Sequence, residues 1–123
     1  MNTLLKNMMV ALLALGIGQA AWADSVPDFK KMLQAAEQGN ADAQYALGGM
    51  YDQGQGVHQD YAQAVQWFRK AAEQGNVEAQ HNLGAVYANG QGVRRNHKIA
   101  KEWFGKACDN GLQQSCDAYR TLD

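Results

Sequence analysis

The sequence repeats itself at a spacing of 36 residues, and this periodicity constrains the fold more than any other feature. The segment Gly-Gln-Gly-Val at residues 54–57 recurs at residues 90–93, and Trp67-Phe68 recurs as Trp103-Phe104. A fixed period of this length is typical of solenoids, in which each repeat packs only against its neighbours. The chain of 123 residues is therefore expected to form one domain of stacked units.

The matches also set the boundaries of the units. They divide residues 24–123 into a half unit at 26–40, full repeats at 42–77 and 78–112, and a C-terminal half unit at 113–123. A stack of this size is close to the minimum that makes a solenoid stable.

Each unit has the pattern of two α-helices. In the first unit, apolar residues recur three and four apart over residues 42–53, and Gly54 then ends the helix. Asp60 is the expected N-cap of a second helix that runs to about residue 74, and Gly75 ends it. Asn96 takes the N-cap role in the second unit. The sequence therefore predicts an all-α fold.

Two glycines lie in the middle of predicted helices, where glycine costs about 1 kcal/mol relative to alanine. We expect Gly48 and Gly84 to permit a close approach of the paired helix, with Ala64 and Ala100 as the facing small residues. The aromatic residues of each unit are interpreted as core that fills the larger gaps: Tyr51, Trp67, Tyr87 and Trp103.

The full unit resembles a known repeat family. The pattern Ala-Gln-x-x-Leu-Gly-x-x-Tyr-x-x-Gly-x-Gly-Val, then Ala-x-x-Trp-Phe-x-Lys-Ala and a final Gly, is similar to the Sel1-like repeat, a relative of the tetratricopeptide repeat. The resemblance covers residues 29 to about 119, and it implies a short right-handed α/α solenoid of antiparallel helix pairs. His58 and Arg94 stand where the family often has Pro, and Asn96-His97 replaces its Asp-Tyr.

The two cysteines, Cys108 and Cys116, are separated by seven residues with Gly111 between them. An even pair in an exported chain is more often bridged than free. The spacing is similar to that of disulfides in cysteine-rich secreted members of the family, which implies a disulfide here. A redox-active pair or a metal site is the alternative, although neither has the usual Cys-x-x-Cys spacing.

The first 23 residues differ from the rest of the chain. Lys6 precedes an uncharged apolar stretch at residues 8–17, and Ala21-Trp22-Ala23 has the small-x-small pattern of a signal peptidase site. These features predict a cleaved signal peptide at 1–23 and a periplasmic or secreted protein without a stable membrane anchor. A buried N-terminal helix or an uncleaved anchor is the alternative.

Without Lys6, ten basic and twelve acidic residues remain, which does not favour nucleic acid or an anionic membrane as partner. One basic cluster stands out, and it is either a solvated face or a contact for an acidic patch: Arg94, Arg95, Lys98 and Lys101.

No catalytic or metal-binding pattern accompanies the repeats. Ser25 and Ser115 lie in no motif of a serine nucleophile. The three histidines, His58, His81 and His97, lack the i, i+4 spacing of metal ligands on a helix. We therefore expect no enzymatic activity, no metal and no cofactor.

By analogy with tetratricopeptide repeats, the first helix of each pair should line a concave groove. The residues between its core positions are then the predicted partner-binding residues: Asp42, Tyr45, Gly49, Asp52, Gln53, Glu78, His81, Ala85, Asn89, Gln114 and Asp117. A mildly acidic groove of this kind suits an extended peptide or loop of basic character.

The favoured function is that of an exported adaptor or scaffold, monomeric, that binds a peptide or protein partner in this groove. One alternative is a periplasmic immunity protein that neutralises a secreted toxic effector. An alternative of another class is a cell-wall-related enzyme such as a β-lactamase-like protein, for which the sequence offers no nucleophile.

Overall fold

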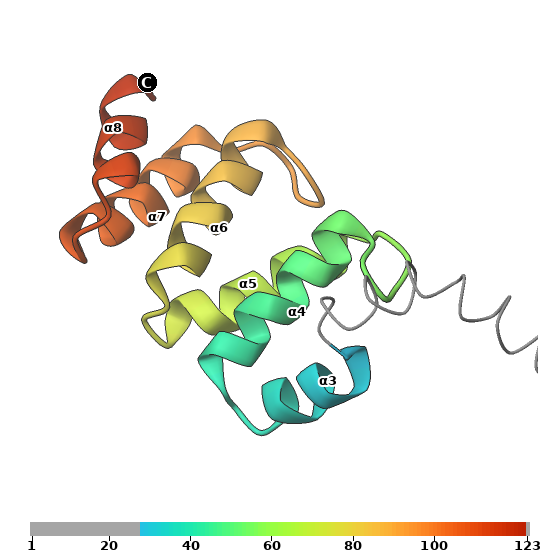
Figure 1. The fold of residues 1–123 in the computed structure, drawn as a ribbon. Helices are drawn as coiled ribbons and strands as arrows, with labels where there is room; N and C mark the ends of the chain where they lie inside the picture. Colours follow the sequence, from blue (N-terminus) through green and yellow to red (C-terminus); the bar gives the residue numbers. More distant parts are fainter. Residues whose placement is uncertain (1–27, 123) are drawn as a thin grey trace, which may run out of the picture.

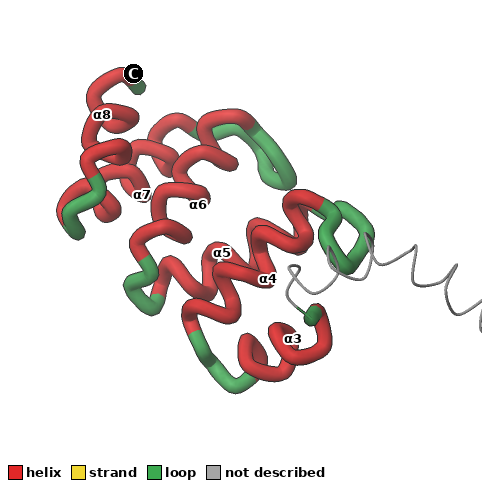
Figure 2. Tube along the Cα trace, in the orientation of Figure 1, coloured by secondary structure: helices red, strands yellow, loops and turns green. Residues whose placement is uncertain are grey.

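The computed structural model describes residues 28–122, which contain six α-helices and no strand (Figures 1 and 2). The helices are α3 (Phe29–Glu37), α4 (Ala41–Gln53), α5 (Tyr61–Glu73), α6 (Val77–Asn89), α7 (His97–Asp109) and α8 (Gln113–Thr121). The predicted all-α class is confirmed. The predicted signal peptide at 1–23 lies outside the described residues.

The helices form a stack of hairpins in which each helix packs mainly against the helices before and after it. The pairs α4–α5 and α6–α7 make the two full hairpins, and α3 and α8 cover the two ends (Figure 1). Hairpins join each other through α3–α4, α5–α6 and α7–α8. This nearest-neighbour packing is the arrangement of a helical solenoid.

Side-chain caps fix the starts of the helices. The Asp60 carboxylate accepts a hydrogen bond from the Gln63 backbone N–H at 3.1 Å, and the Asn96 side chain accepts one from Ile99 at 3.0 Å. Both predicted N-caps are therefore confirmed. Helix α8 differs, because its N-cap residue is Leu112 and no side chain caps it.

The mid-helix glycines do permit a close approach, but the residue that approaches is not the one expected. A Cβ atom at Gly48 would lie 2.6 Å from Cδ1 of Phe68, and one at Gly84 would lie 2.7 Å from Cδ1 of Phe104. The side chain nearest to each glycine thus belongs to the aromatic residue four positions after Ala64 or Ala100. A flat aromatic ring covers the bare backbone more completely than a methyl group could.

The core consists of two apolar clusters that follow the stack. One cluster joins α5 and α6 around Phe68 and Leu83, and the other joins α3, α4 and α5 around Leu47 and Trp67. Tyr51 is partly buried and packs against both. The interpretation of the aromatic residues as core is confirmed.

Candidate functional site

Buried glutamines connect successive hairpins at equivalent positions of the repeat. The Gln44 side-chain amide donates to the backbone carbonyl of Ala36 at 3.0 Å, across the corner between α3 and α4. Thirty-six residues later, the Gln80 amide donates to the Ala72 carbonyl at 3.2 Å, across the corner between α5 and α6. The Gln of the repeated Ala-Gln pair therefore joins its own helix to the preceding helix by a hydrogen bond from its side chain to a backbone carbonyl, and this contact is called the glutamine staple.

The other end of each glutamine side chain is also bonded. The Gln44 carbonyl oxygen accepts a hydrogen bond from Gln74 at 2.7 Å, and that of Gln80 accepts one from Asn110 at 2.9 Å. A buried amide is tolerated when both its donor and its acceptor have partners. These bonds explain why a polar residue occupies a buried position in both repeats.

At the third corner, a disulfide takes the place of this hydrogen bond. Cys108 lies 36 residues after Ala72, and Cys116 lies 36 residues after Gln80. The two cysteines are bonded, with their Cα atoms 4.6 Å apart, and join α7 to α8. The predicted disulfide is present in the structure and is a covalent version of the glutamine staple.

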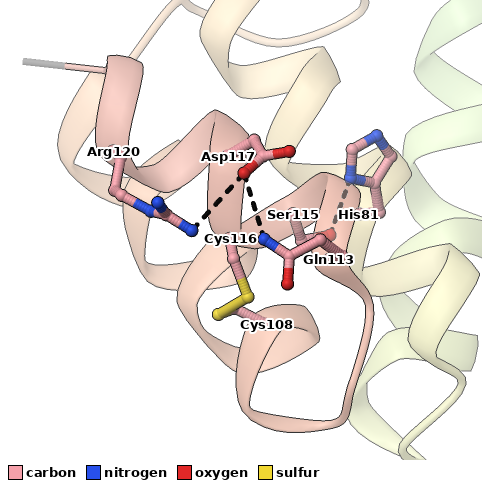
Figure 3. The surroundings of a disulfide bond; sticks show 7 residues. All are labelled: His81, Cys108, Gln113, Ser115, Cys116, Asp117 and Arg120. Carbon is pink, nitrogen blue, oxygen red and sulfur yellow. Dashed lines mark hydrogen bonds and ion pairs between the residues drawn. A yellow bond between two sulfur atoms is a disulfide. The ribbon is translucent and has the colours of Figure 1, made fainter.

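Helix α8 is held by further side-chain contacts (Figure 3). Ser115 is fully buried, and its hydroxyl lies 2.7 Å from Nδ1 of His81 on α6. Burial lowers the pKa of His81, which favours the neutral imidazole. Because the Ser115 hydroxyl has no exposed surface, this pair joins helices and presents no accessible nucleophile.

Three of the predicted groove residues meet at one pocket between α4 and α6. Asp52 and Gln53 come from the end of α4, and Ala85 comes from the middle of α6. The pocket has a volume of about 260 Å³, and its remaining lining residues are Phe68, Asn82, Val86 and Gln91. Burial raises the pKa of the Asp52 carboxyl group above its usual range.

Tyr45 and His81, also predicted to line the groove, have a packing role as well. Both are partly buried. The Tyr45 ring lies 5.9 Å from that of Phe68, and the His81 ring lies 5.2 Å from that of Phe104. Substitution at either position should therefore change stability as well as any contact with a partner.

The other predicted groove residues are distributed along α4, α6 and α8. Asp42 is exposed, and its carboxylate accepts a hydrogen bond from Asn76 at 3.1 Å. Asp117 accepts a hydrogen bond from Gln113 at 3.1 Å and forms an ion pair with Arg120 at 3.4 Å (Figure 3). The rest are partly or fully accessible: Gly49, Glu78, Asn89 and Gln114.

Two polar residues of the pocket, Asn82 and Gln91, were not predicted from the sequence. Asn82 occupies the repeat position of Ala46, so the two units differ there by one amide side chain. That difference between otherwise similar units is the signal that could have identified it. Gln91 repeats Gln55 of the first unit, so a comparison of the two units gives no such signal for it.

The four residues of the basic cluster lie in different surroundings. Arg94, Arg95 and Lys98 are exposed at the loop and the start of α7. The Lys101 ammonium instead lies over the Tyr119 ring of α8, 4.8 Å from its centroid. This contact covers part of an exposed aromatic side chain at the end of the stack.

The two alternating sets of helices in the stack carry opposite net charges. Helices α4, α6 and α8 carry a net charge of −3, from Asp42, Asp52, Glu78, Asp117 and Arg120. Helices α3, α5 and α7 carry +3, from the basic Lys30, Lys31, Arg69, Lys70, Lys98, Lys101 and Lys106 and the acidic Glu37, Glu73, Glu102 and Asp109. The face with the pocket is thus acidic, although the described chain as a whole is not.

Two other properties bear on the class of protein. Within residues 28–122, no group of three His, Cys, Asp or Glu side chains is arranged to hold a metal ion. None of the six described helices combines the length and the apolar character needed to cross a membrane.

The hairpin stack, the glycine-ended helices and the glutamine staples define the chain as an α/α repeat protein. The family model of the Sel1 repeat matches residues 41–76 and 77–112. The chain therefore belongs to the Sel1 repeat family.

Solved structures of Sel1 repeat proteins have the same fold. A Sel1 repeat protein from Oxalobacter formigenes is 36% identical with a TM-score of 0.72, over 74% of this chain and 37% of that chain. The protein c5321, a protective antigen of uropathogenic Escherichia coli strains, is 40% identical with a TM-score of 0.73, over 76% and 21%. Helicobacter pylori cysteine rich protein B (hcpB) is 30% identical with a TM-score of 0.70, over 73% and 68%.

The chain thus corresponds to about a third of the first of these proteins and a fifth of the second. No curated protein sequence matches it.

Proposed function

We propose that this protein is an exported interaction module that binds a peptide or protein partner on the face formed by α4, α6 and α8. The observation that carries the proposal is the polar pocket between α4 and α6, which contains Asp52, Gln53 and Ala85. The other groove residues predicted from the sequence lie on the same three helices and would form the margins of the contact.

The family supports an interaction role at the level of class. Sel1 repeats commonly mediate protein–protein interaction and are generally scaffold modules without enzymatic activity. A fold by itself does not define a partner, so the proposal depends on the site. The acidic character of the face and the polar lining of its pocket favour a partner segment with hydrogen-bonding and basic groups.

Export is supported by two features of the chain. The signal-peptide pattern at residues 1–23 predicts passage through the membrane, and a disulfide between Cys108 and Cys116 persists in an oxidising compartment. We therefore propose that the protein is periplasmic or secreted.

A pull-down from bacterial envelope extract tests the proposed face. The immobilised protein is compared with Gln53→Lys, which places a long cationic side chain at the acidic pocket, and with Gln66→Lys, which adds the same group to the exposed surface of α5. We expect the wild type and Gln66→Lys to retain the same proteins, and Gln53→Lys to lose them. Equal retention by all three, with unchanged thermal stability, would contradict the proposed face.

A further inference from the structure

The pocket between α4 and α6 has the chemistry of a site for a single cationic side chain. We propose that this pocket binds a lysine or arginine side chain of an extended partner segment, with the Asp52 carboxylate as counter-charge. This proposal rests on the proposed function. This assigns a partner chemistry to one residue of the face rather than to the face as a whole.

The surroundings of the Asp52 carboxylate favour a bound cation. Its side chain is partly withdrawn from water, yet within residues 28–122 its carboxylate has neither a hydrogen bond nor an ion pair. A carboxylate that loses water without gaining a partner is destabilised, and a bound cation would remove that penalty. By contrast, Asp42 has a hydrogen-bond partner and Asp117 an ion pair.

The other residues that line the pocket suit a long basic side chain. Gln53, Asn82 and Gln91 each bring a side-chain amide whose oxygen can accept from an ammonium or a guanidinium group. Ala85, Val86 and Phe68 add apolar surface, which suits the methylene stem of Lys or Arg. The lining therefore matches both parts of a long basic side chain.

The charges around the pocket also favour a cation from outside. Neither α4 nor α6, which supply five of the seven lining residues, carries a Lys or Arg residue. The basic groups of the neighbouring helix α5 are Arg69 and Lys70, and both have aromatic partners: Arg69 lies over the Tyr87 ring and Lys70 over the Trp67 ring. Arg94 and Arg95, in the same loop as Gln91, are exposed. An external cation therefore meets no basic residue on α4 or α6 and only aromatic-paired basic residues on α5.

Within residues 28–122, the repeat does not reproduce the polar lining of the pocket at the next boundary. At the next boundary, between α6 and α8, Ala88 stands at the repeat position of Asp52, and Ala118 stands at that of Asn82. The carboxylate and the amide are both replaced by methyl groups there. Among the described residues, the proposal therefore places one cationic anchor point on this face rather than a periodic row.

Peptide sublibraries provide the test. Short synthetic peptides are random at every position except a central one, which is Lys, Arg, or the neutral analogues norleucine and citrulline. Their affinities are measured by fluorescence polarisation for the wild type, for Asp52→Asn, and for Glu73→Gln, which removes one charge from the exposed surface of α5. Thermal melts check that all three proteins are folded.

We expect the wild type to bind the Lys and Arg sublibraries roughly tenfold more tightly than their neutral analogues, a difference of about 1.4 kcal/mol. Asp52→Asn should lose this preference, and Glu73→Gln should keep it. An equal loss in both variants would overturn the proposal, because it would show an effect of net charge alone.

The remaining outcomes separate this inference from the proposed function. Binding of all sublibraries without a cation preference overturns the cation pocket and leaves the binding face standing. Failure of every sublibrary to bind also overturns the pocket. The proposed function falls with it only if Gln53→Lys still retains the envelope proteins in the pull-down.

Discussion

The two boundaries between successive first helices of the stack are built differently. At the boundary between α4 and α6, the corner is held by a hydrogen bond from Gln80 to the Ala72 carbonyl, and the pocket nearby contains Asp52. At the boundary between α6 and α8, the corner is held by the Cys108–Cys116 disulfide. Alanine replaces the carboxylate there.

This difference suggests a division of roles along a short stack. The terminal helix α8 has nine residues and no side-chain cap, so it needs added stabilisation, which the disulfide supplies. The internal boundary is covered by hairpins on both sides and can tolerate a partly desolvated carboxylate. We infer that the internal boundary serves binding and the terminal boundary serves stability.

The largest expected effect follows removal of the disulfide. Cys108→Ala with Cys116→Ala should lower the free energy of unfolding by about 2.5 kcal/mol, the loop-closure value for a loop of this size. Urea unfolding followed by circular dichroism measures the change. A loss well below 1 kcal/mol would show that the α7–α8 corner does not depend on the bond.

Cys108→Ala with Cys116→Gln is the matched control, because it recreates the residue pair of the other two corners. We expect it to be more stable than the double alanine variant by roughly 1 kcal/mol, the usual net value of a hydrogen bond. No difference between the two variants would contradict the equivalence of the staples.

The glutamine staple at the internal boundary should be the next most important. Gln80→Leu removes two side-chain hydrogen bonds, one to the Ala72 carbonyl and one from the Asn110 amide, which at roughly 1 kcal/mol each should cost about 2 kcal/mol. Urea unfolding measures it, and Gln66→Leu on the exposed surface of α5 is the control. Equal stability of the two variants would mean that Gln80 is not a staple.

A disulfide should also form at the corner between α5 and α6 when cysteines are introduced there. Ala72→Cys with Gln80→Cys places two cysteines at the repeat positions of Cys108 and Cys116. Under oxidising conditions we expect a bond that raises the free energy of unfolding by about 0.5 kcal/mol, since the loop-closure gain of about 2.5 kcal/mol slightly exceeds the roughly 2 kcal/mol lost with the two hydrogen bonds of Gln80. Thiol titration and urea unfolding test this, and free thiols in the folded protein would contradict it.

A smaller change in folding stability is expected with pH. Burial holds the pKa of His81 below its ordinary value of 6.5, so the unfolded chain takes up a proton before the folded one. Stability should therefore be constant with respect to this group above pH 6.5 and decrease as the pH falls below it. His81→Gln should show a flatter pH profile of the melting temperature, and an unchanged slope would contradict this origin.

The smallest effect is expected at the pocket. Burial raises the pKa of Asp52 above 3.8. The ionised carboxylate therefore destabilises the fold at a pH above the pKa that this group has in the unfolded chain. Asp52→Asn should thus raise the melting temperature slightly at neutral pH. The gain should disappear as the pH falls below 3.8, and a loss of stability at neutral pH would show instead that the carboxylate is stabilising.

Much of the fold could be predicted from the sequence, because the repeat presents the same local signals twice. The N-caps Asp60 and Asn96 and the glycine at position 54 are local features, and each fixes a helix end regardless of the rest of the chain. The partner of Gly48 could not be predicted. It depends on the rotation of α5 against α4, which only packing decides.

Less of the candidate site could be predicted. Helical register predicts that Asp52 and Ala85 lie on one face, but it does not predict how deeply each side chain is buried. The partly buried Tyr45 and the exposed Asp42 therefore have the same interpretation from the sequence. The staple function of Gln80 was missed because its partners, the Ala72 carbonyl and Asn110, lie on other helices. Contacts between elements of this kind follow from the relative placement of hairpins.

Site-specific photocrosslinking in living cells tests the binding face most directly. A photoreactive phenylalanine analogue is placed either at Gln53, beside the pocket, or at Gln66, on the exposed surface of α5. We predict a discrete crosslinked product from position 53 that Asp52→Asn weakens, and none from position 66. Crosslinking from position 66 alone would contradict the assignment of partner binding to the face formed by α4, α6 and α8.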